Sequence, residues 1–353
     1  MDGDNKVTII DVAKKAGVSK GTVDRVLHNR GEVSERSARK VRQAIQELNY
    51  QPNLYASLLA TRRRLAIACL LPKSEAGEYW DMIHRGCLRG GEEVSSLGVS
   101  LDVFFYDQYD VESFREASSA MLASEPIGVV LPPLFKSDTL ALSEKLYEKN
   151  IPYAYIDGKV EDSHYLAYFG MPPYNSGVLV AALLTERCKV QEVKDILVVR
   201  VQRDKSGLSD PTVDRRAGFV DYIDAHFPEC RIHNVFIDPK SPKAIYAALD
   251  GFAKEHGEIP LVAVFNSRVH LIVPFLSDHP CEGRRVIGYD DLEKNVSALR
   301  SGAVTILVGQ NTEEYVAQAV STLVDYAIRH KSPARRDNFV HMDILTALNI
   351  ENY

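Results

Sequence analysis

VTIIDVAKKAGVSKGTVDRVL, residues Val7–Leu27, is the stretch that decides the fold of this chain. Thr8 and Asp11 form a pair of the kind that caps a helix start, and they predict a helix over residues 9–16. Gly17 can adopt the positive φ of a helix C-terminus. A second short helix follows this turn at once. The segment therefore predicts a helix-turn-helix, the geometry that lays its second helix into the DNA major groove.

The second helix is predicted over residues 20–28, with Ser19 as its cap. Its apolar residues Val23, Val26 and Leu27 share one face at i, i+3, i+4 spacing. We expect the other face to be turned outward, with four residues on it: Lys20, Gly21, Asp24 and Arg25.

A third helix is predicted from its cap at Ser34 to about Leu48. Its expected buried stripe consists of Ala38, Val41, Ala44, Ile45 and Leu48. Three helices in about fifty residues make a small core, which is sufficient for a module tethered to a larger body. Pro52 stops the third helix, and Asn53 caps a further short helix in YQPNLYASLLA, residues 50–60.

The charge of the chain is distributed unevenly. Residues 1–64 hold 13 Lys and Arg against 7 Asp and Glu, whereas the remainder holds 29 against 41. Only the N-terminal part is basic, so only that part is expected to seek phosphates. The acidic remainder speaks against a nucleic-acid enzyme.

From Leu65 onward, short apolar runs alternate with stretches of helical length. Strands are expected at 65–72, 101–106, 127–133, 152–157, 195–201, 261–265, 285–290 and 304–309. Helices are expected at 82–97, 113–123, 176–188, 213–225, 243–255 and 312–330. This alternation predicts an α/β body with parallel sheets, helices on both faces, and ligands beyond the strand C-termini. The pattern repeats before and after about residue 172, which predicts two similar lobes with a cleft between them.

Other function classes find little support. The nucleotide-binding, hydrolase and zinc-protease motifs GxGxxG, GxxxxGK[ST], GxSxG and HExxH do not occur. The ten histidines form no ligand-spaced pair, and the five cysteines are widely spaced, typical of reduced thiols. No run of about twenty apolar residues exists, and MDGDNKV is unlike a signal peptide. We expect a cytoplasmic protein with no catalytic residue, metal, cofactor or membrane contact.

VTIIDVAKKAGVSKGTVDRVL and then NYQPNLYASLLA resemble the DNA-binding headpiece and hinge of the lactose-repressor (LacI/GalR) family. The resemblance is close over the first sixty residues and looser beyond. It implies a headpiece at 1–50, a hinge at 51–63, and a body at 64–353 for effector binding and dimerisation. The body would have the two-lobed periplasmic-binding-protein-like fold, with lobe 1 at 64–171 plus 310–333 and lobe 2 at 172–309 plus 334–353.

By this resemblance, Lys20 and Gly21 select operator bases and Arg25 reads a guanine edge, for which its planar donor fork is suited. Ser19 and Thr22 would bond phosphates and set the register. Thr8 completes the DNA-binding set in the headpiece.

One departure from the family concerns Asp24, which stands where a phosphate-binding serine is usual. A carboxylate that faces phosphate costs affinity. We therefore expect Asp24 to pair with Arg25, His28 or Lys20.

The hinge contributes Asn53, Ala56 and Leu59 to the expected DNA contacts. A helix of about eight residues is unstable alone, so it would form only when two copies pack together in the minor groove. Leu59 matches the family's wedge leucine, which opens a base step and bends the duplex. The alternative is that Leu58 and Leu59 are linker residues that pack on the body.

For the effector site, the resemblance points to Arg215, Asp290 and Gln310. Arg215 lies in DRRAGF, which matches the family's RxxGF, and its side chain would reach ligand hydroxyls. Asp290 matches the family's GxD, where a carboxylate accepts two hydroxyl protons in a dry cleft. Gln310 matches the crossover glutamine, which offers a donor and an acceptor.

Asn266 is a further ligand candidate, although Ser267 replaces the aspartate that usually follows it in the family. Pro172 and Pro173 stand where a crossover aspartate of the first lobe is common. Both departures speak against a standard hexose as the effector.

Tyr79, Trp80 and Asp157 are further ligand candidates, because they follow predicted strands of the body. Trp80, the only tryptophan, can stack on the apolar face of a sugar ring, or it can pack under the first helix of the body. Tyr106 and Asp107 are weaker candidates, and a solvated loop residue is the simpler interpretation of Asp107.

The expected function is a homodimeric, ligand-gated transcriptional regulator, a repressor, that binds pseudo-palindromic operator DNA and senses a sugar or related polyol. An effector of another class, a purine or a protein partner, remains an alternative. So does a solute-binding protein, which the headpiece disfavours. The residues 344–353 show no leucine heptads, so no tetramerising coil is expected.

Overall fold

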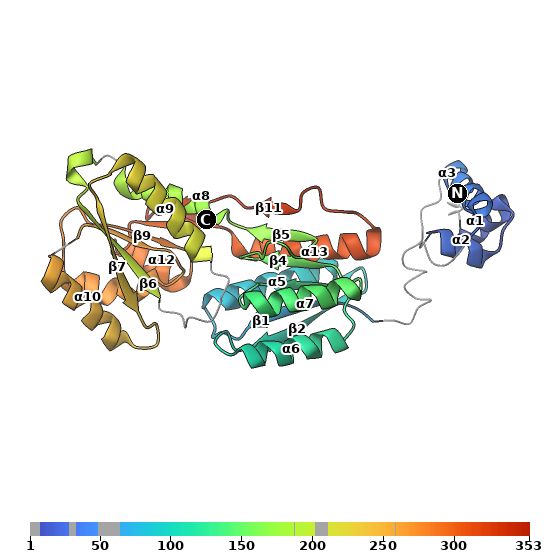
Figure 1. The fold of residues 1–353 in the computed structure, drawn as a ribbon, viewed down its shortest axis with the longest axis horizontal. Coiled ribbons are helices and arrows are strands. Elements are labelled where there is room, and N and C mark those ends of the chain that lie inside the picture. The colour runs from blue at the N-terminus through green and yellow to red at the C-terminus, as the bar shows by residue number, and fades with distance from the viewer. Residues whose placement is uncertain (1–7, 28–32, 49–63, 187, 202–210, 258) are drawn as a thin grey trace. The chain divides into compact units, whose positions relative to one another are not determined.

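The computed structural model describes residues 8–27, 33–48, 64–186, 188–201, 211–257 and 259–353 (Figure 1). The chain divides into two compact units, Met1–Arg64 and Leu65–Tyr353. This division falls within one residue of the predicted start of the body. The predicted hinge contacts Asn53, Ala56 and Leu59 lie outside the described residues.

The N-terminal unit contains α1 (Ile9–Ala16), α2 (Lys20–Leu27) and α3 (Glu35–Glu47). The cap at the start of α1 is confirmed: the Thr8 hydroxyl accepts the Asp11 backbone N–H at 3.4 Å, and Asp11 Oδ2 accepts the Thr8 N–H at 2.9 Å. Gly17 has φ 65°, the left-handed conformation that the turn requires. These local signals produce the predicted helix-turn-helix.

The core of this unit is formed by buried residues of all three helices: Val12, Ala13, Ala16, Val23, Val41 and Ala44. Val26, Ile45 and Leu48 are partly buried and pack against it. The i, i+3, i+4 patterns of α2 and α3 therefore face one another, as amphipathic helices do when they bury their apolar stripes.

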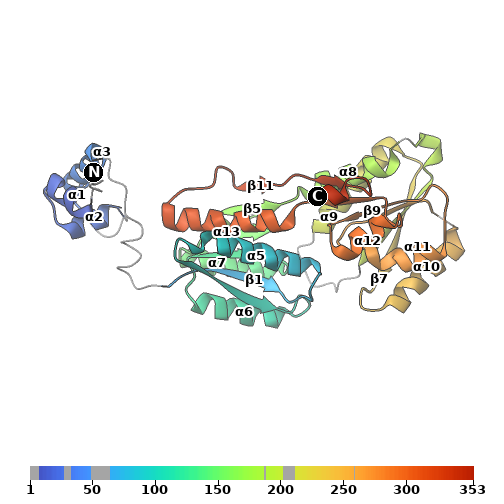
Figure 2. The same cartoon turned by 180° about the vertical axis from the view of Figure 1, so that it is seen from behind.

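The first lobe of the body contains a six-stranded sheet. Its order is β11 (Asp337–Phe339), β5 (Ala167–Gly170), β4 (Tyr153–Ile156), β3 (Gly128–Leu131), β1 (Leu65–Pro72) and β2 (Val99–Tyr106). All its strands are parallel. One face is covered by α5 (Tyr79–Ser95) and α13 (Thr312–Arg329), the other by α6 (Val111–Ala123) and α7 (Lys136–Glu148) (Figures 1 and 2).

The second lobe repeats this arrangement. Its sheet order is β12 (Asp343–Leu345), β10 (Ile306–Gly309), β9 (Arg285–Tyr289), β8 (Leu261–Val264), β6 (Asp195–Val201) and β7 (Arg231–Ile237). The strands are parallel except β12, which is antiparallel to β10. The first five strands of each lobe have the same spatial order, so β4 corresponds to β9 and β5 to β10.

The helices of the second lobe cover both faces of its sheet, and each face has its own apolar core. On one face lie α8 (Pro173–Thr185) and α9 (Pro211–His226). On the other lie α10 (Pro242–His256), η2 (Val269–Ile272), α11 (Val273–Asp278) and α12 (Glu293–Arg300). The short 3-10 helices η1 (Val190–Glu192) and η3 (Ile350–Asn352) complete the body. The predicted two-lobed fold with parallel sheets is confirmed.

One lobe boundary was predicted incorrectly. Residues 334–353 were assigned to the second lobe, but β11 pairs with β5 in the first sheet. Lys159 Nζ and the Tyr165 hydroxyl both bond the Asp337 carboxylate, at 2.6 and 3.0 Å, and hold this strand in place. The chain therefore crosses between the lobes three times: after β5, after β10 and after β11.

Two glycines set a very close crossing of α8 and α9. A Cβ at Gly177 would lie 1.7 Å from the carbonyl oxygen of Arg215, and one at Gly218 would lie 2.1 Å from that of Tyr174. Backbone cannot yield as a flexible side chain can, so no larger residue fits. The crossing fixes the start of α9, which carries Arg215.

We predict that Gly177→Ala lowers the free energy of unfolding by about 1–3 kcal/mol or more, because the added methyl forces α9 away from α8. Urea denaturation of the whole chain measures this loss. Gly251→Ala is the matched control, since Gly251 lies in α10 with nothing within 4 Å of the added carbon. Equal unfolding midpoints for the two variants would contradict the close crossing.

Candidate functional site

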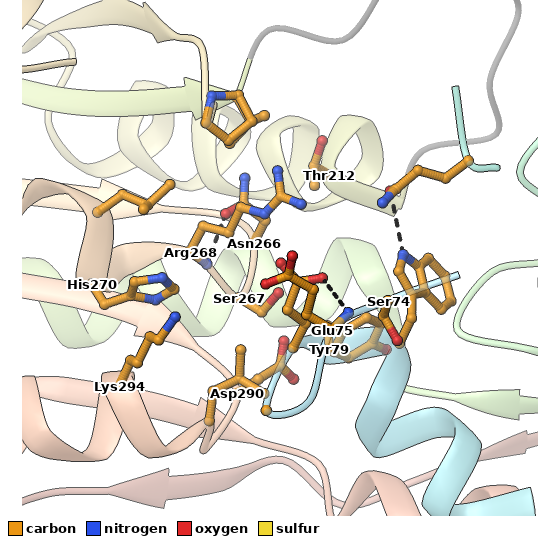
Figure 3. A pocket seen from close by; sticks show the side chains of 18 of the residues that line it. Ser74, Glu75, Tyr79, Thr212, Asn266, Ser267, Arg268, His270, Asp290 and Lys294 are labelled. Atoms are coloured by element: carbon orange, nitrogen blue, oxygen red, sulfur yellow. Dashed lines mark hydrogen bonds between the residues drawn. The ribbon is translucent and has the colours of Figure 1, made fainter. Parts of the chain in front are cut away.

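A cavity of about 730 Å³ is lined by residues of both lobes (Figure 3). Its walls are the loops that follow strand C-termini and the first turns of the helices beyond them. Six of the seven predicted ligand residues line it: Tyr79, Trp80, Asp157, Arg215, Asn266 and Asp290. The seventh, Gln310, is 2% exposed and lies directly behind the lining, in hydrogen-bond contact with Asp290.

Asp157 and Asp290 occupy corresponding positions in the two lobes. Each directly follows a strand, β4 or β9, and each has a left-handed backbone, with φ 65° and 64°. The N–H of Asp157 donates to Phe169 on the adjacent strand, and that of Asp290 to Val308, at 3.1 and 3.0 Å. Because Asp tolerates this conformation better than most residues, both strand ends can turn a carboxylate toward the cavity.

A polar network connects the two carboxylates across the lobes. The Tyr79 hydroxyl donates to Asp157 Oδ1 at 2.7 Å, and Gln310 Nε2 donates to Asp290 Oδ1 at 2.9 Å. Gln310 Nε2 also lies 3.4 Å from the Tyr79 hydroxyl, which is 3.3 Å from that of Tyr315. Gln310 thus lies where the chain returns to the first lobe and contacts groups of both lobes.

Arg215 is the buried cation of the cavity, at 5% exposed. Its Nη1 donates to the carbonyl of Phe265 at 2.9 Å, and its guanidinium lies 4.3 Å from the ring centroid of Tyr289. These contacts orient the fork and leave Nε without a hydrogen-bond partner among the described residues. A buried donor of this kind is satisfied when a ligand oxygen accepts from it.

The electrostatics of Asp290 reflect its burial. Burial raises the pKa of Asp290 to about 7, opposed by the charge of Arg215 and reinforced by that of Asp157. The hydrogen bond from Gln310, like the charge of Arg215, lowers the pKa of Asp290. The cavity therefore holds a carboxyl group poised between its two protonation states near neutral pH.

We predict that Asp290→Asn raises the melting temperature, with a gain that grows from pH 5 to pH 7 and then levels off. The unfolded chain ionises this carboxyl near pH 3.9, whereas the folded chain keeps the proton until about pH 7. Stability of the unmodified protein therefore falls over this window, and the neutral amide avoids the loss. Thermal unfolding at pH 5, 7 and 8 measures the gain, with exposed Asp107→Asn as the control. A gain independent of pH would contradict the raised pKa.

The aromatic lining of the cavity includes Trp80, which was predicted, and Tyr109, which was not. Trp80 is 5% exposed, and its indole Nε1–H donates to Gln108 Oε1 at 3.4 Å. Tyr109 lies opposite Lys240 of the second lobe, whose Nζ is 4.4 Å from the Tyr109 ring centroid. This cation–π contact between the lobes was not predicted.

Two weaker candidates do not reach the cavity. Tyr106 is fully buried in the first lobe, where its ring packs edge-on against Phe114. Asp107 is exposed and accepts the Tyr109 N–H at 2.9 Å, so it shapes the loop and does not line the cavity. Pro173, in place of a family aspartate, is the first residue of α8, where its fixed φ suits a helix start.

Several lining residues were missed: Lys73, Glu75, Glu78, Arg268, His270 and Lys294 among the charged ones. Arg268 and Lys294 follow β8 and β9 closely, so the rule that ligands bind beyond strand C-termini could have found them. Asn295 and Tyr315 do not line the cavity but bond residues that do, and their buried positions on α12 and α13 give no such signal.

The headpiece presents a separate candidate surface on α2. Lys20, Gly21 and Arg25 are exposed, as predicted, whereas Asp24 is half-buried rather than turned outward. Arg25 Nε donates to the Gly21 carbonyl at 3.2 Å, which leaves the two terminal amino groups of its fork for another acceptor. The hydroxyls of Ser19 and Thr22 lie 2.9 Å apart, and Ser19 caps the helix through the Thr22 N–H. Thr8 is exposed at the start of α1.

Two kinds of feature are absent from the described part of the chain. In that part of the chain, no helix has the length and apolar character needed to span a bilayer. Nor do three or more His, Cys, Asp or Glu side chains gather there in a geometry suited to a metal ion.

The chain matches two protein families. Residues 67–331 match the family described as "Periplasmic binding protein domain", and residues 8–53 match "Bacterial regulatory proteins, lacI family". Among curated proteins, the HTH-type transcriptional regulator MalR of Streptococcus pneumoniae is 42% identical over 90 residues, which are 26% of this chain and 27% of MalR. The match therefore spans about a quarter of that relative's length.

Solved structures match the body more completely. A structure from Bacteroides fragilis, assigned to the LacI transcriptional regulators, is 32% identical with a TM-score of 0.76 and covers 82% of this chain and 99% of its own. A glucose-galactose binding protein from Geobacillus stearothermophilus has a TM-score of 0.69 at 16% identity, with coverage of 82% and 99%. The second likeness shows the fold alone.

Proposed function

Since this chain belongs to the lacI family of bacterial regulatory proteins, we propose that it is a transcriptional regulator whose binding to operator DNA is controlled by a small molecule in the cavity of its body. The observation that carries this proposal is the presence, in one chain, of a complete helix-turn-helix and a cavity shared by two lobes. A reader of DNA and a receptor in one molecule make a switch.

The cavity suits a polyhydroxylated effector, a sugar or related polyol. Asp157 and Asp290 supply acceptors from opposite lobes, and Arg215 supplies donors. Such charge-assisted hydrogen bonds to hydroxyls are strong in a site withdrawn from water. Trp80 and Tyr79 add aromatic surface for the apolar face of a sugar ring. The glucose-galactose binding protein of similar fold is consistent with this chemistry.

In the headpiece, we propose that Lys20 and Arg25 contact base edges and that Ser19, Thr22 and Thr8 contact the backbone. Gly21 presents no side chain at its base pair. Asn53, Ala56 and Leu59 would form the paired minor-groove hinge.

We propose that the effector controls operator binding by changing the relative position of the two lobes. An effector that bonds Asp157 and Asp290 together stabilises one relative position of the lobes, and it shifts the equilibrium by its difference in affinity for the two arrangements. In a homodimer this displaces the two hinges. We propose that the protein acts as a cytoplasmic homodimer at inverted-repeat operators, as a repressor, and that it binds its effector without transforming it.

The test uses the full chain. Random double-stranded DNA is put through rounds of binding and amplification, and the enriched sequences are compared. The proposal predicts an inverted repeat with two half-sites. Calorimetry with neutral sugars and polyols then identifies binding to the body, and purines are the competing class. Enrichment of no sequence would refute the regulator, whereas heat from purines alone would refute only the sugar class.

A further inference from the structure

The wall of the cavity in the second lobe is strongly basic. Among its described lining residues are four basic side chains, Arg215, Lys240, Arg268 and Lys294, and a single acidic one, Asp290. His270 lies among them (Figure 3). The first-lobe wall adds Lys73 and three carboxylates, Glu75, Glu78 and Asp157, so the excess of positive charge is confined to the second-lobe wall, where a neutral polyol has no need of it.

Arg268, His270 and Lys294, which we name the basic corner, are gathered by two short helices. Arg268 and His270 flank the start of η2, and Lys294 is in the first turn of α12. Burial lowers the pKa of His270 most, and the charges of Lys294 and Arg268 lower it further, against the hydrogen bond with Asn295 and the charge of Glu78, which raise it.

The basic corner is held in place by one buried amide. Asn295, 0% exposed, donates through Nδ2 to the carbonyls of Ser267, Tyr289 and Asp290, at 3.0, 3.1 and 3.1 Å. Its Oδ1 accepts the His270 backbone N–H at 3.2 Å and lies 2.8 Å from His270 Nδ1. Because Oδ1 can only accept, Nδ1 carries the proton, and Nε2 of the neutral ring is an acceptor. The loop that carries Arg268 and His270 is thus preorganised beside Asp290.

The carboxylates on the opposite wall offset the charge of the basic corner only in part, since the charge of Glu78 raises the pKa of His270 against the effects of Lys294 and Arg268. Glu75 and Glu78 line the first-lobe wall, but neither forms an ion pair with Arg268 or Lys294 in the described structure. Glu78 Oε2 instead accepts the Glu75 backbone N–H at 3.2 Å, within its own loop. Arg268, which is half-buried, and Lys294, which is exposed, form no ion pair among the described residues, so both can bind an anion in the cavity.

Resting on the proposed function, we propose that the effector is an anionic carbohydrate, a sugar acid or a sugar phosphate. Its hydroxyls bond Asp157, Asp290 and Arg215, and its carboxylate or phosphate group is held by the basic corner. Arg268 offers a planar fork for two oxygens, and Lys294 a point charge.

The experiment is calorimetry on the full chain with matched sets: glucose, glucuronate and glucose 6-phosphate, and the corresponding galactose compounds, with inorganic phosphate as the ion alone. We expect an acidic member to bind about 10- to 100-fold more tightly than its neutral parent, since hydrogen bonds to charged groups contribute that much. The uronate and phosphate arms identify which anion fits.

The variant Arg268→Gln with Lys294→Gln is expected to remove this preference while affinity for the neutral parent changes less than threefold. Lys73→Gln, which removes one positive charge from the first-lobe wall, is the control for each single variant, Arg268→Gln and Lys294→Gln, and should keep the preference. Thermal unfolding checks that all variants fold.

Neutral sugars that bind as tightly as their acids, or a preference that survives the double variant, would overturn the anionic effector and leave the regulator intact. Binding of no carbohydrate would overturn the effector class, whereas loss of operator selection would overturn the proposed function itself.

Discussion

Asp290→Ala is expected to abolish the response of operator binding to the effector while leaving operator affinity unchanged. Asp290 is 3% exposed, lines the cavity, and is tied through Gln310 to the first lobe. Removing one partner of a buried, charge-assisted hydrogen bond costs about 2–5 kcal/mol, or roughly 30- to several-thousand-fold in affinity. Fluorescence anisotropy of labelled operator, titrated with protein at several effector concentrations, measures both quantities.

The adjacent Asp291 provides a matched control. It is half-buried but does not line the cavity, so Asp291→Ala should keep the effector response. An Asp290→Ala protein that responds at the original effector concentration would remove Asp290 from the binding site. Weakened operator affinity without effector would show that Asp290 serves the fold instead.

Arg25→Ala is expected to weaken specific operator binding by about 1–3 kcal/mol for each half-site and to relax the base preference at one position. Arg25 is exposed on α2, and its terminal amino groups are not used by the hydrogen bond to Gly21. The effector site belongs to the other compact unit, so calorimetric affinity for the effector should be unchanged. Binding measured against operators altered at each position tests the result.

Arg42→Ala serves as the comparison for charge alone, because Arg42 is exposed on α3 and lies off the recognition helix. Its loss should weaken binding to all sequences alike and reduce the salt dependence. If Arg25→Ala behaved in the same way, with every base preference retained, Arg25 would be a phosphate contact and not a reader of bases.

The headpiece could be predicted almost residue by residue because its signals are local. The Thr8 cap, the left-handed Gly17 and the stripe of α3 each act within one or two helical turns. Asp24 is the exception, since its half-burial depends on neighbouring helices that spacing alone does not place. In the body, the apolar runs at β1 and β6 were predicted to their exact ends.

Elements whose sequence lacks a local signature were missed. AYFG of β5 is only four residues long, and RIHNVFI of β7 mixes polar residues into an exposed edge strand. The strand β11 forms because Lys159 and Tyr165, far away in sequence, bond Asp337. No property of residues 337–339 alone assigns them to the first sheet.

The residues of the candidate site also fall into two groups, those that the sequence predicts and those that only the tertiary structure reveals. Asp157, Asp290 and Asn266 could be placed because they follow strands, whose C-terminal ends meet at one edge of each sheet. The contact of Lys240 with Tyr109 and the clamp formed by Asn295 arise from tertiary packing between distant segments. Their residue types carry no spacing that distinguishes them from solvated or capping side chains.

We propose that occupancy of the cavity decides whether the paired headpieces hold the operator. The most direct measurement is the affinity of the full chain for its selected inverted repeat, without effector and with effector at saturation. A change of at least fivefold, about 1 kcal/mol of coupling, is predicted, together with the same fold-change in effector affinity when operator is bound. An operator affinity that stays constant while the effector saturates the cavity would contradict it.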